Sequence, residues 1–237
     1  MAYRRTENVL RRLAARHDAI VAAARAAADD GGMAAVQIAP VAARAGIAAG
    51  TVYRYFPGKL ELVAALVEDV SRREIASLRR AAGAAPGPLS ALAAVAVTFG
   101  ARALRHRRLA WAVMAEPVDS ATDELRRTHR KALAAEFEHR IAAAIAGGHL
   151  SEQDTTLAAA SAVGALFEGL IGPLAPEIGG QVARMREAVQ AVTLNVLRGL
   201  GVADAHARGL VVQTLLPSVE SGDGQAAIPA SPPQSSG

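Results

Sequence analysis

The chain has 237 residues, of which 51% are hydrophobic, with 26 basic and 22 acidic residues and no cysteine. That length can hold a small domain and a larger one, each with its own core. The lack of cysteine excludes a disulfide framework and thiolate chemistry. The sequence shows neither the apolar segment of a signal peptide nor a run of roughly 18 apolar residues. We therefore expect a cytoplasmic protein with no membrane partner.

Basic residues are concentrated at the N-terminus. Residues 1–59 hold 9 Lys/Arg against 4 Asp/Glu, a net charge of +5, so the remaining 178 residues carry a net −1. Within this region, residues 1–16 contain five arginines and are expected to form a basic arm that precedes the first globular helix. The arm is either a solvated segment or an extension that follows phosphates or the minor groove of DNA.

Residues 38–56 carry the most informative pattern. Apolar residues recur at helical spacing from Ile38 to Ala45 and end at Gly46, which predicts a short helix with a glycine at its C-terminal end. A second short segment, 50–56, contains three of the eight aromatic residues of the chain. Val52 and Phe56 are four residues apart and are expected to face the core. Two short helices joined by a glycine turn predict a helix-turn-helix, whose second helix enters the major groove.

Residues 17–70 resemble the DNA-binding domain of the tetracycline-repressor (TetR) family of bacterial transcription regulators. The resemblance is carried by the run AGIAAGTVYRYFPGKLEL, from Ala45 to Leu62. It implies that Tyr53 and Lys59 contact phosphates and that Arg54 reads a base. The DNA-binding residues that we expect are Gln37, Ala48, Ala49, Gly50, Thr51, Tyr53, Arg54, Tyr55 and Lys59.

The chain departs from the family pattern at two places. Ala48 stands where members often have the serine that caps the recognition helix, and a missing cap costs about 1 kcal/mol. Many members open the preceding helix with Thr and then a polar or Arg residue. This chain has Gln37, Ile38, Ala39 and Pro40 instead, which predicts fewer DNA contacts there.

The resemblance implies an all-α fold, with an N-terminal three-helix helix-turn-helix domain over 17–62 and a larger helical ligand-binding and dimerisation domain over 63–200. Beyond residue 62 the sequence predicts an amphipathic helix up to a break at 83–88, a helix over 89–106 and a short segment over 107–116. A long helix then ends at Gly147-Gly148. Two further helices are predicted, one from the Ser151/Asp154 capping box to about 172 and a last one over about 177–200. Residues 201–237 form a C-terminal extension, with a short helix before residue 216 and a disordered tail from about 217.

In this family the larger domain binds a small molecule, and binding moves the recognition helices out of register with the operator. The expected lining is mostly apolar and comprises Phe99, Arg102, Trp111, Met114, Phe137 and Phe167, with His106, Glu116 and Asp119 as further polar anchors. Each of these side chains alternatively fills the core. Trp111 is favoured as a lining residue because it lies in a short, interrupted segment. Such a lining indicates a lipophilic effector, and no cofactor is expected.

Two stripes near the C-terminus have the spacing of helix-pairing seams. One comprises Val182, Met185, Val189, Val192 and Val196, and the other Ala158, Ala162, Ala165 and Gly169. From the spacing alone, both stripes either pair with another subunit or face their own core. The resemblance implies that the last two main helices form a four-helix dimer interface, so we predict a homodimer.

Enzymatic patterns are weak in this sequence. Glu136 and His139 have the i, i+3 spacing of half a di-metal site, but no second Glu-x-x-His occurs, and no phosphate-binding loop or nucleophile elbow is present. The sequence thus predicts a non-enzymatic transcriptional regulator of the repressor type, which binds a near-palindromic operator on double-stranded DNA as a homodimer and is released by a small-molecule effector. The alternative is a helical small-molecule-binding or partner-binding protein that keeps the fold but has lost sequence-specific DNA binding.

Overall fold

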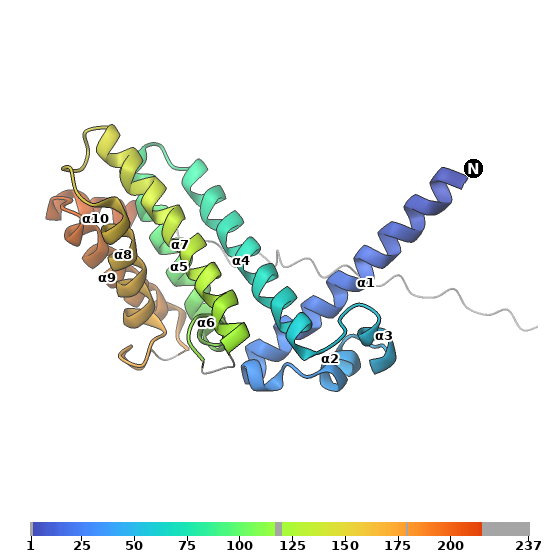
Figure 1. Cartoon of the computed structure of the whole chain (residues 1–237). Helices are drawn as coiled ribbons and strands as arrows, with labels where there is room; N and C mark the ends of the chain where they lie inside the picture. The colour runs from blue at the N-terminus through green and yellow to red at the C-terminus, as the bar shows by residue number, and fades with distance from the viewer. Residues whose placement is uncertain (1, 117–119, 179, 215–237) are drawn as a thin grey trace, which may run out of the picture.

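The structure, a computed structural model, describes residues 2–116, 120–178 and 180–214, with side chains described from residue 7 onward. Its described residues form helices and no β-strand (Figure 1). In chain order these are α1 (Ala2–Gly31), the 3₁₀ helix η1 (Met33–Ala35), α2 (Ile38–Arg44), α3 (Ala49–Tyr53), α4 (Lys59–Gly83), α5 (Pro88–Arg105), α6 (Arg107–Met114), α7 (Ser120–Ala146), α8 (Thr155–Leu170), α9 (Val182–Gly199) and α10 (Asp204–Gln213).

The helices enclose two hydrophobic cores. The smaller core joins the second half of α1, α2, α3 and the beginning of α4 around fully buried residues such as Ile20, Val41 and Val52. The larger core lies among α4, α5, α7, α8, α9 and α10, where Leu92 and Phe137 are completely buried. The all-α, two-domain architecture that the sequence predicts is confirmed.

Two helices belong to both parts of the molecule. The first half of α4 buries Leu62 and Leu66 in the smaller core, and its second half buries Leu78 in the larger one. Helix α6 contributes Leu109 and Val113 to the smaller core, although it follows α5 in the chain. The expected boundary between residues 62 and 63 therefore falls inside a continuous helix, because the apolar stripe of α4 serves two cores in succession.

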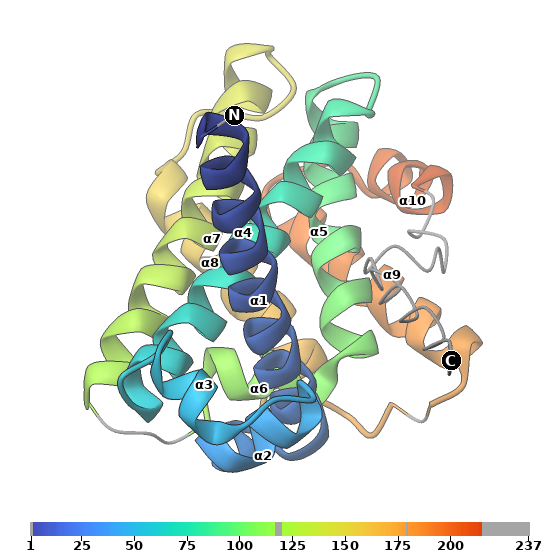
Figure 2. The same cartoon turned by 90° about the vertical axis from the view of Figure 1, so that its right-hand side faces the viewer.

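The arginine-rich segment is not an arm that precedes the first helix. Residues 2–16 are the N-terminal half of α1, which runs without interruption to Gly31 and projects away from the body of the molecule (Figures 1 and 2). The segment contains no glycine or proline and is rich in alanine, leucine and arginine, all strong helix formers. These residues extend the helix because nothing in their sequence interrupts it.

The C-terminal elements differ from expectation in three details. Asp154, rather than Ser151, caps α8 by accepting a hydrogen bond from the Leu157 N–H at 3.0 Å. Helix α9 begins at Val182 instead of about residue 177. The expected short helix exists as α10, but Ala207 is completely buried in the larger core, so α10 belongs to that domain rather than to an extension. The tail predicted from about 217 lies outside the described residues.

Candidate nucleic-acid interface and domain-junction cavity

Helices α2 and α3 form the predicted helix-turn-helix. Gly46 follows α2 with a φ of 67°, a left-handed conformation that glycine adopts without strain. The Ile47 N–H donates to the Ala42 carbonyl at 3.0 Å, and this bond closes the turn. Four residues separate the end of α2 from Ala49, where α3 starts, so the turn fixes the angle between the two helices.

The apolar side of α3 attaches it to the small domain. Val52 and Phe56 are buried, as the sequence predicts, and the Phe56 ring lies 5.1 Å from the ring of His17 on α1. Tyr55, one of the residues expected to bind DNA, is half-buried against the same core. The opposite side of α3 presents Gly50, Tyr53 and Arg54, at positions i, i+3 and i+4, to solvent.

The residues expected to bind DNA fall into two groups by exposure. Ala49, Thr51 and Tyr55 are half-buried, whereas Gln37, Ala48, Gly50, Tyr53, Arg54 and Lys59 are exposed. The Gln37 amide donates to the Ala34 carbonyl at 3.1 Å. The side chains of Tyr53, Arg54 and Lys59 have no hydrogen-bond or ion-pair partner among the described residues, so their polar groups are available to a ligand.

Gly50 is open to the outside of the molecule. A Cβ added there would meet no atom within 4 Å, so packing within the protein does not require a glycine. A glycine at an exposed helix surface lets another backbone approach closely. No side chain caps α3, because Ala48 at its N-cap has no oxygen to offer.

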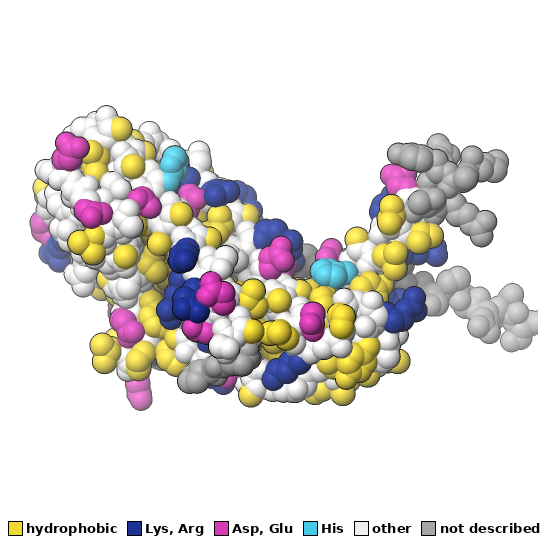
Figure 3. Space-filling model, in the orientation of Figure 1, with side chains coloured by type: hydrophobic (Ala, Val, Ile, Leu, Met, Phe, Trp, Pro, Cys, Tyr) yellow, Lys and Arg dark blue, Asp and Glu magenta, His cyan; other side chains and the backbone are white. Residues whose placement is uncertain are grey.

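The projecting half of α1 lies at the same end of the molecule as α3 (Figure 1). It carries both basic and hydrophobic side chains, and open space separates it from the larger domain (Figure 3). Arg11, Arg12 and Arg16 are exposed along it. The exposed arginines of α1 and the exposed Arg54 beside α3 therefore lie at the same end of the molecule.

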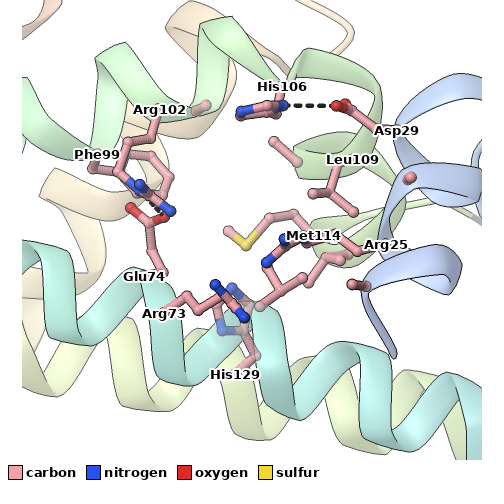
Figure 4. Close-up of a pocket in the computed structure, with 16 residues that line it drawn as sticks. Arg25, Asp29, Arg73, Glu74, Phe99, Arg102, His106, Leu109, Met114 and His129 are labelled. Atoms are coloured by element: carbon pink, nitrogen blue, oxygen red, sulfur yellow. Dashed lines mark hydrogen bonds and ion pairs between the residues drawn. The ribbon is translucent and has the colours of Figure 1, made fainter. Parts of the chain in front are cut away.

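A cavity of about 240 Å³ lies where the two domains meet, and five helices line it (Figure 4). Helix α1 contributes Arg25 and Asp29, and the other lining residues come from α4, α5, α6 and α7. The expected lining residues Phe99, Arg102 and Met114 are brought together here, and so is the expected polar anchor His106. The cavity therefore belongs to neither domain alone.

Ion pairs join the cavity's polar groups. Arg102 donates from Nε to Glu74 Oε2 at 2.8 Å, and His106 Nδ1 lies 2.6 Å from Asp29 Oδ2. Burial raises the pKa of Glu74, against the opposing effect of Arg102. Its second oxygen, Oε1, is buried and has no hydrogen-bond partner.

His129 lies on the α7 side of the cavity and is 4% exposed. Burial, and then the charge of Arg130, lower the pKa of His129 to about 4. The imidazole is therefore neutral at pH 7, and its Nδ1 has no hydrogen-bond partner. It offers one unused polar atom in an otherwise largely apolar wall.

The other expected lining residues lie elsewhere. Phe137 is completely buried in the larger core. Trp111 stacks on Phe167, with ring centroids 6.1 Å apart, and neither ring lines the cavity. Glu116 accepts a hydrogen bond from the Met33 N–H at 3.1 Å and so ties α6 to η1, while Asp119 lies outside the described residues.

Sequence reasoning missed Arg25, Asp29, Arg73, Glu74 and His129 as lining residues. The spacing of these residues does not indicate a binding site, because each is a single charged or polar residue on a helix and no recognisable motif surrounds it. Only the packing of α1 and α4 against α5, α6 and α7 brings them to one cavity.

The two predicted dimer stripes are partly wrong. Val189, Val196 and Ala162 are buried in the core of their own chain. Val192 packs so closely on Gly169 that a Cβ there would lie 2.9 Å from it, which shows that α8 and α9 pair within the subunit. Ala165 and Val182 are exposed, and Ala158 and Met185 are partly buried. The spacing of a helix pair is the same within a chain and between chains, so periodicity could not separate the two.

The structure offers no support for a metal site or a membrane segment in the part of the chain that it describes. Glu136 is buried and accepts hydrogen bonds from Arg79 at 3.0 Å and from Arg140 at 2.5 Å, so both its oxygens have cationic partners. No group of three or more potential ligands for a metal ion occurs among the described residues. None of their helices has the length and apolar character needed to cross a bilayer.

A small helix-turn-helix domain joined to a larger helical domain defines a class of two-domain DNA-binding proteins. Residues 20–66 match the family described as bacterial regulatory proteins, tetR family. Residues 20–66 therefore form a DNA-binding domain of the TetR type. The HTH-type transcriptional repressor KstR of Mycobacterium tuberculosis is 48% identical over 73 residues, which are 30% of this chain and 33% of that repressor. The match thus spans about a third of the relative's length.

Solved structures share the fold over most of the chain. RolR in complex with resorcinol is 20% identical, with a TM-score of 0.62 over 87% of this chain and 97% of RolR. The fatty acid degradation regulator FadR from Bacillus halodurans is also 20% identical, with a TM-score of 0.66 over 77% of this chain and 98% of FadR. SmeT in complex with triclosan is 22% identical, with a TM-score of 0.63 over 78% of this chain and 91% of SmeT. At these identities the likeness concerns the fold alone.

Proposed function

We propose that this protein is a transcriptional repressor that binds a near-palindromic operator as a homodimer and leaves it when a small molecule occupies the junction cavity. The observation that carries the proposal is the outward face of α3, where Tyr53, Arg54 and the nearby Lys59 lack partners among the described residues. Arg54 suits a guanine edge in the major groove, and Tyr53 and Lys59 suit phosphates. Gly50 leaves room for the DNA backbone.

Charge supports the same surface. The net +5 of residues 1–59 coincides with the helix-turn-helix, while the rest of the chain is close to neutral. Neutralisation of phosphates releases counterions, so a cationic surface gains affinity for DNA that falls as salt rises. The repressor KstR, which is 48% identical to this chain over 73 residues, supports a repressing role.

The test of the proposal is capture of fragments of the source genome on the purified protein at near-physiological salt, followed by sequencing. Recovery of a near-palindromic site would support the regulator. Loss of all sequence preference in a protein that is still dimeric would favour the alternative, a helical small-molecule carrier. The segment from Gln37 to Pro40, which departs from the family pattern, is the observation that motivates this alternative.

The projecting half of α1 is proposed to follow the phosphate backbone beside the operator. An α-helix is about 10–12 Å wide with its side chains, whereas the minor groove is only about 6 Å wide, so a helix does not fit the groove. Removal of residues 1–12 takes away four arginines and should make the salt dependence of DNA affinity shallower. An unchanged slope would remove this segment from the interface.

The dimer is proposed to form through the exposed face of α8. Small and apolar residues lie along this face: Leu157, Ala160, Ser161, Gly164 and Ala165. A Cβ at Gly164 would meet nothing within 4 Å, so the face can accept another helix closely. Gly164→Arg should convert the dimer to a monomer in sedimentation experiments, whereas Ala142→Arg, on an exposed position of α7, should not. A dimeric Gly164→Arg variant would move the interface elsewhere.

A further inference from the structure

One buried carboxylate beside the junction cavity is shared by several arginines. Asp69, which is buried on α4, pairs with three arginines: Arg25 at 3.4 Å, Arg72 at 2.7 Å and Arg73 at 2.8 Å. The other two carboxylates at the cavity have partners of their own, Glu74 an arginine, Arg102, and Asp29 a histidine, His106. Because Arg72 does not line the cavity, the group around Asp69 presents two arginines to it for one carboxylate.

Two of these three arginines line the cavity. Arg25 comes from α1 in the DNA-binding domain, and Arg73 comes from α4; both are labelled in Figure 4. Asp69 itself is not a lining residue, so it holds the arginines from behind. Arg73 uses only its Nε toward Asp69, and Arg25 uses only one terminal nitrogen. A guanidinium has five N–H donors, so most of theirs are left for a ligand.

The remainder of the cavity suits an apolar group. Val70, Phe99, Leu109, Val113 and Met114 line it, and the Met114 side chain extends into it in Figure 4. The neutral imidazole of His129 adds no charge to this wall. Cationic groups on one side and hydrocarbon on the other complement a molecule with an anionic head and an apolar body.

We propose that the effector is an amphipathic carboxylate, whose head is bound jointly by Arg25 of the DNA-binding domain and Arg73 of α4 and whose apolar chain or ring fills the cavity. This inference rests on the proposed role of the cavity as the effector site. Planar guanidinium groups match a carboxylate with paired hydrogen bonds, and Asp69 orients both of them in advance. Arg25 makes the DNA-binding domain part of the ligand site.

The position of Arg25 gives the ligand a direct route to the DNA-binding surface. A ligand shifts a conformational equilibrium only by its different affinity for the two states. A carboxylate that bridges α1 and α4 binds best at one separation of these helices, and α1 also contacts the segment that directly follows α3, through His17 and Phe56. Occupancy therefore selects one orientation of the recognition helix relative to the larger domain.

The test compares three probes with the same eight-carbon chain: octanoate, octan-1-ol and octylamine. Binding to the full-length protein without DNA is measured by isothermal titration calorimetry, with the fluorescence of the single tryptophan, Trp111 on α6, as a second readout. Octanoate should bind at least tenfold more tightly than either of the others. Octanol or octylamine binding as tightly as octanoate would overturn the proposal.

Matched arginine variants locate the head. Arg25→Gln and Arg73→Gln should each abolish the preference for octanoate over octanol, whereas Arg72→Gln should keep it, because Arg72 pairs with the same Asp69 but lies outside the cavity. An Arg72→Gln loss equal to that of Arg25→Gln would show a general charge effect and refute the bridging role. Arg25→Lys keeps the positive charge and serves as a control for misfolding of the Arg25→Gln variant. It should retain part of the preference for octanoate over octanol.

These measurements are independent of the operator. Octanoate binding with no recovered DNA site would leave the ligand class intact and remove the regulator function. A recovered operator together with no preference for octanoate would support the regulator function and refute the proposed ligand class.

Discussion

The recognition face of α3 and the junction cavity both depend on arginine, but the two regions hold it differently. Arg54 is exposed and has no partner within the described chain, so its side chain is free to adapt to a base edge. Arg25, Arg73 and Arg102 are each fixed by a carboxylate before any ligand arrives. Under the proposed function, the same fold presents an adaptable cation to DNA and pre-oriented cations to a small molecule.

The largest expected effect separates the two sides of α3. Phe56→Ala removes a buried ring that joins α3 to α1 and should destabilise the protein by about 3–5 kcal/mol in urea unfolding. Tyr53→Ala, on the exposed side, should change stability by less than about 0.5 kcal/mol. Similar losses in both variants would mean that α3 has no distinct outward face.

The second effect concerns the cavity and depends on pH. His129 has a folded-state pKa of about 4 against an ordinary value of 6.5, so the unfolded chain binds the proton more readily between these values. Its contribution to stability is complete above about pH 6.5 and is lost as the pH falls toward 4, by about 3 kcal/mol in total. Urea unfolding at pH 7.5 and 4.5 measures it.

The control for this effect is on the same helix. His129→Gln should flatten the pH dependence, while His139→Gln, at an exposed position of α7, should leave it unchanged. An unaltered pH profile in His129→Gln would show that another group is responsible.

The third effect divides the roles within the DNA surface. Arg54→Ala should relax specificity at one base position by about 1–3 kcal/mol, because a base contact is lost. Lys59→Ala should weaken binding to all DNA sequences similarly. It should also reduce by about 1 the slope of log affinity against log salt concentration. Binding to a set of operator variants distinguishes them, and identical sequence profiles would show that Arg54 does not read a base.

The smallest effect tests Gly50. Gly50→Ala should leave folding stability unchanged or raise it by up to about 1 kcal/mol, because the added methyl meets no atom within 4 Å and alanine favours a helix. DNA affinity should nevertheless fall, since the methyl occupies the space through which the DNA backbone approaches. Thermal unfolding and a DNA titration on the same sample measure both. Full DNA affinity would place Gly50 outside the interface.

The sequence by itself determined the helix-turn-helix, because its signals are local: Gly46 requires a turn, and Val52 and Phe56 repeat at the spacing of one helix face. The same local reasoning located most helices of the larger domain and identified the family that residues 20–66 match.

Tertiary structure alone decided how faces and charges are used. Val189 and Val196 face the core of their own chain, although their spacing also fits a dimer seam. Trp111 stacks on Phe167, although its place in a short segment favours it as a ligand-lining residue. Tertiary structure also brought Arg25 and Arg73, which are 48 positions apart in the chain, to one carboxylate and one cavity. Periodicity reports which side of a helix is apolar, whereas the identity of the partner on that side depends on how distant helices pack.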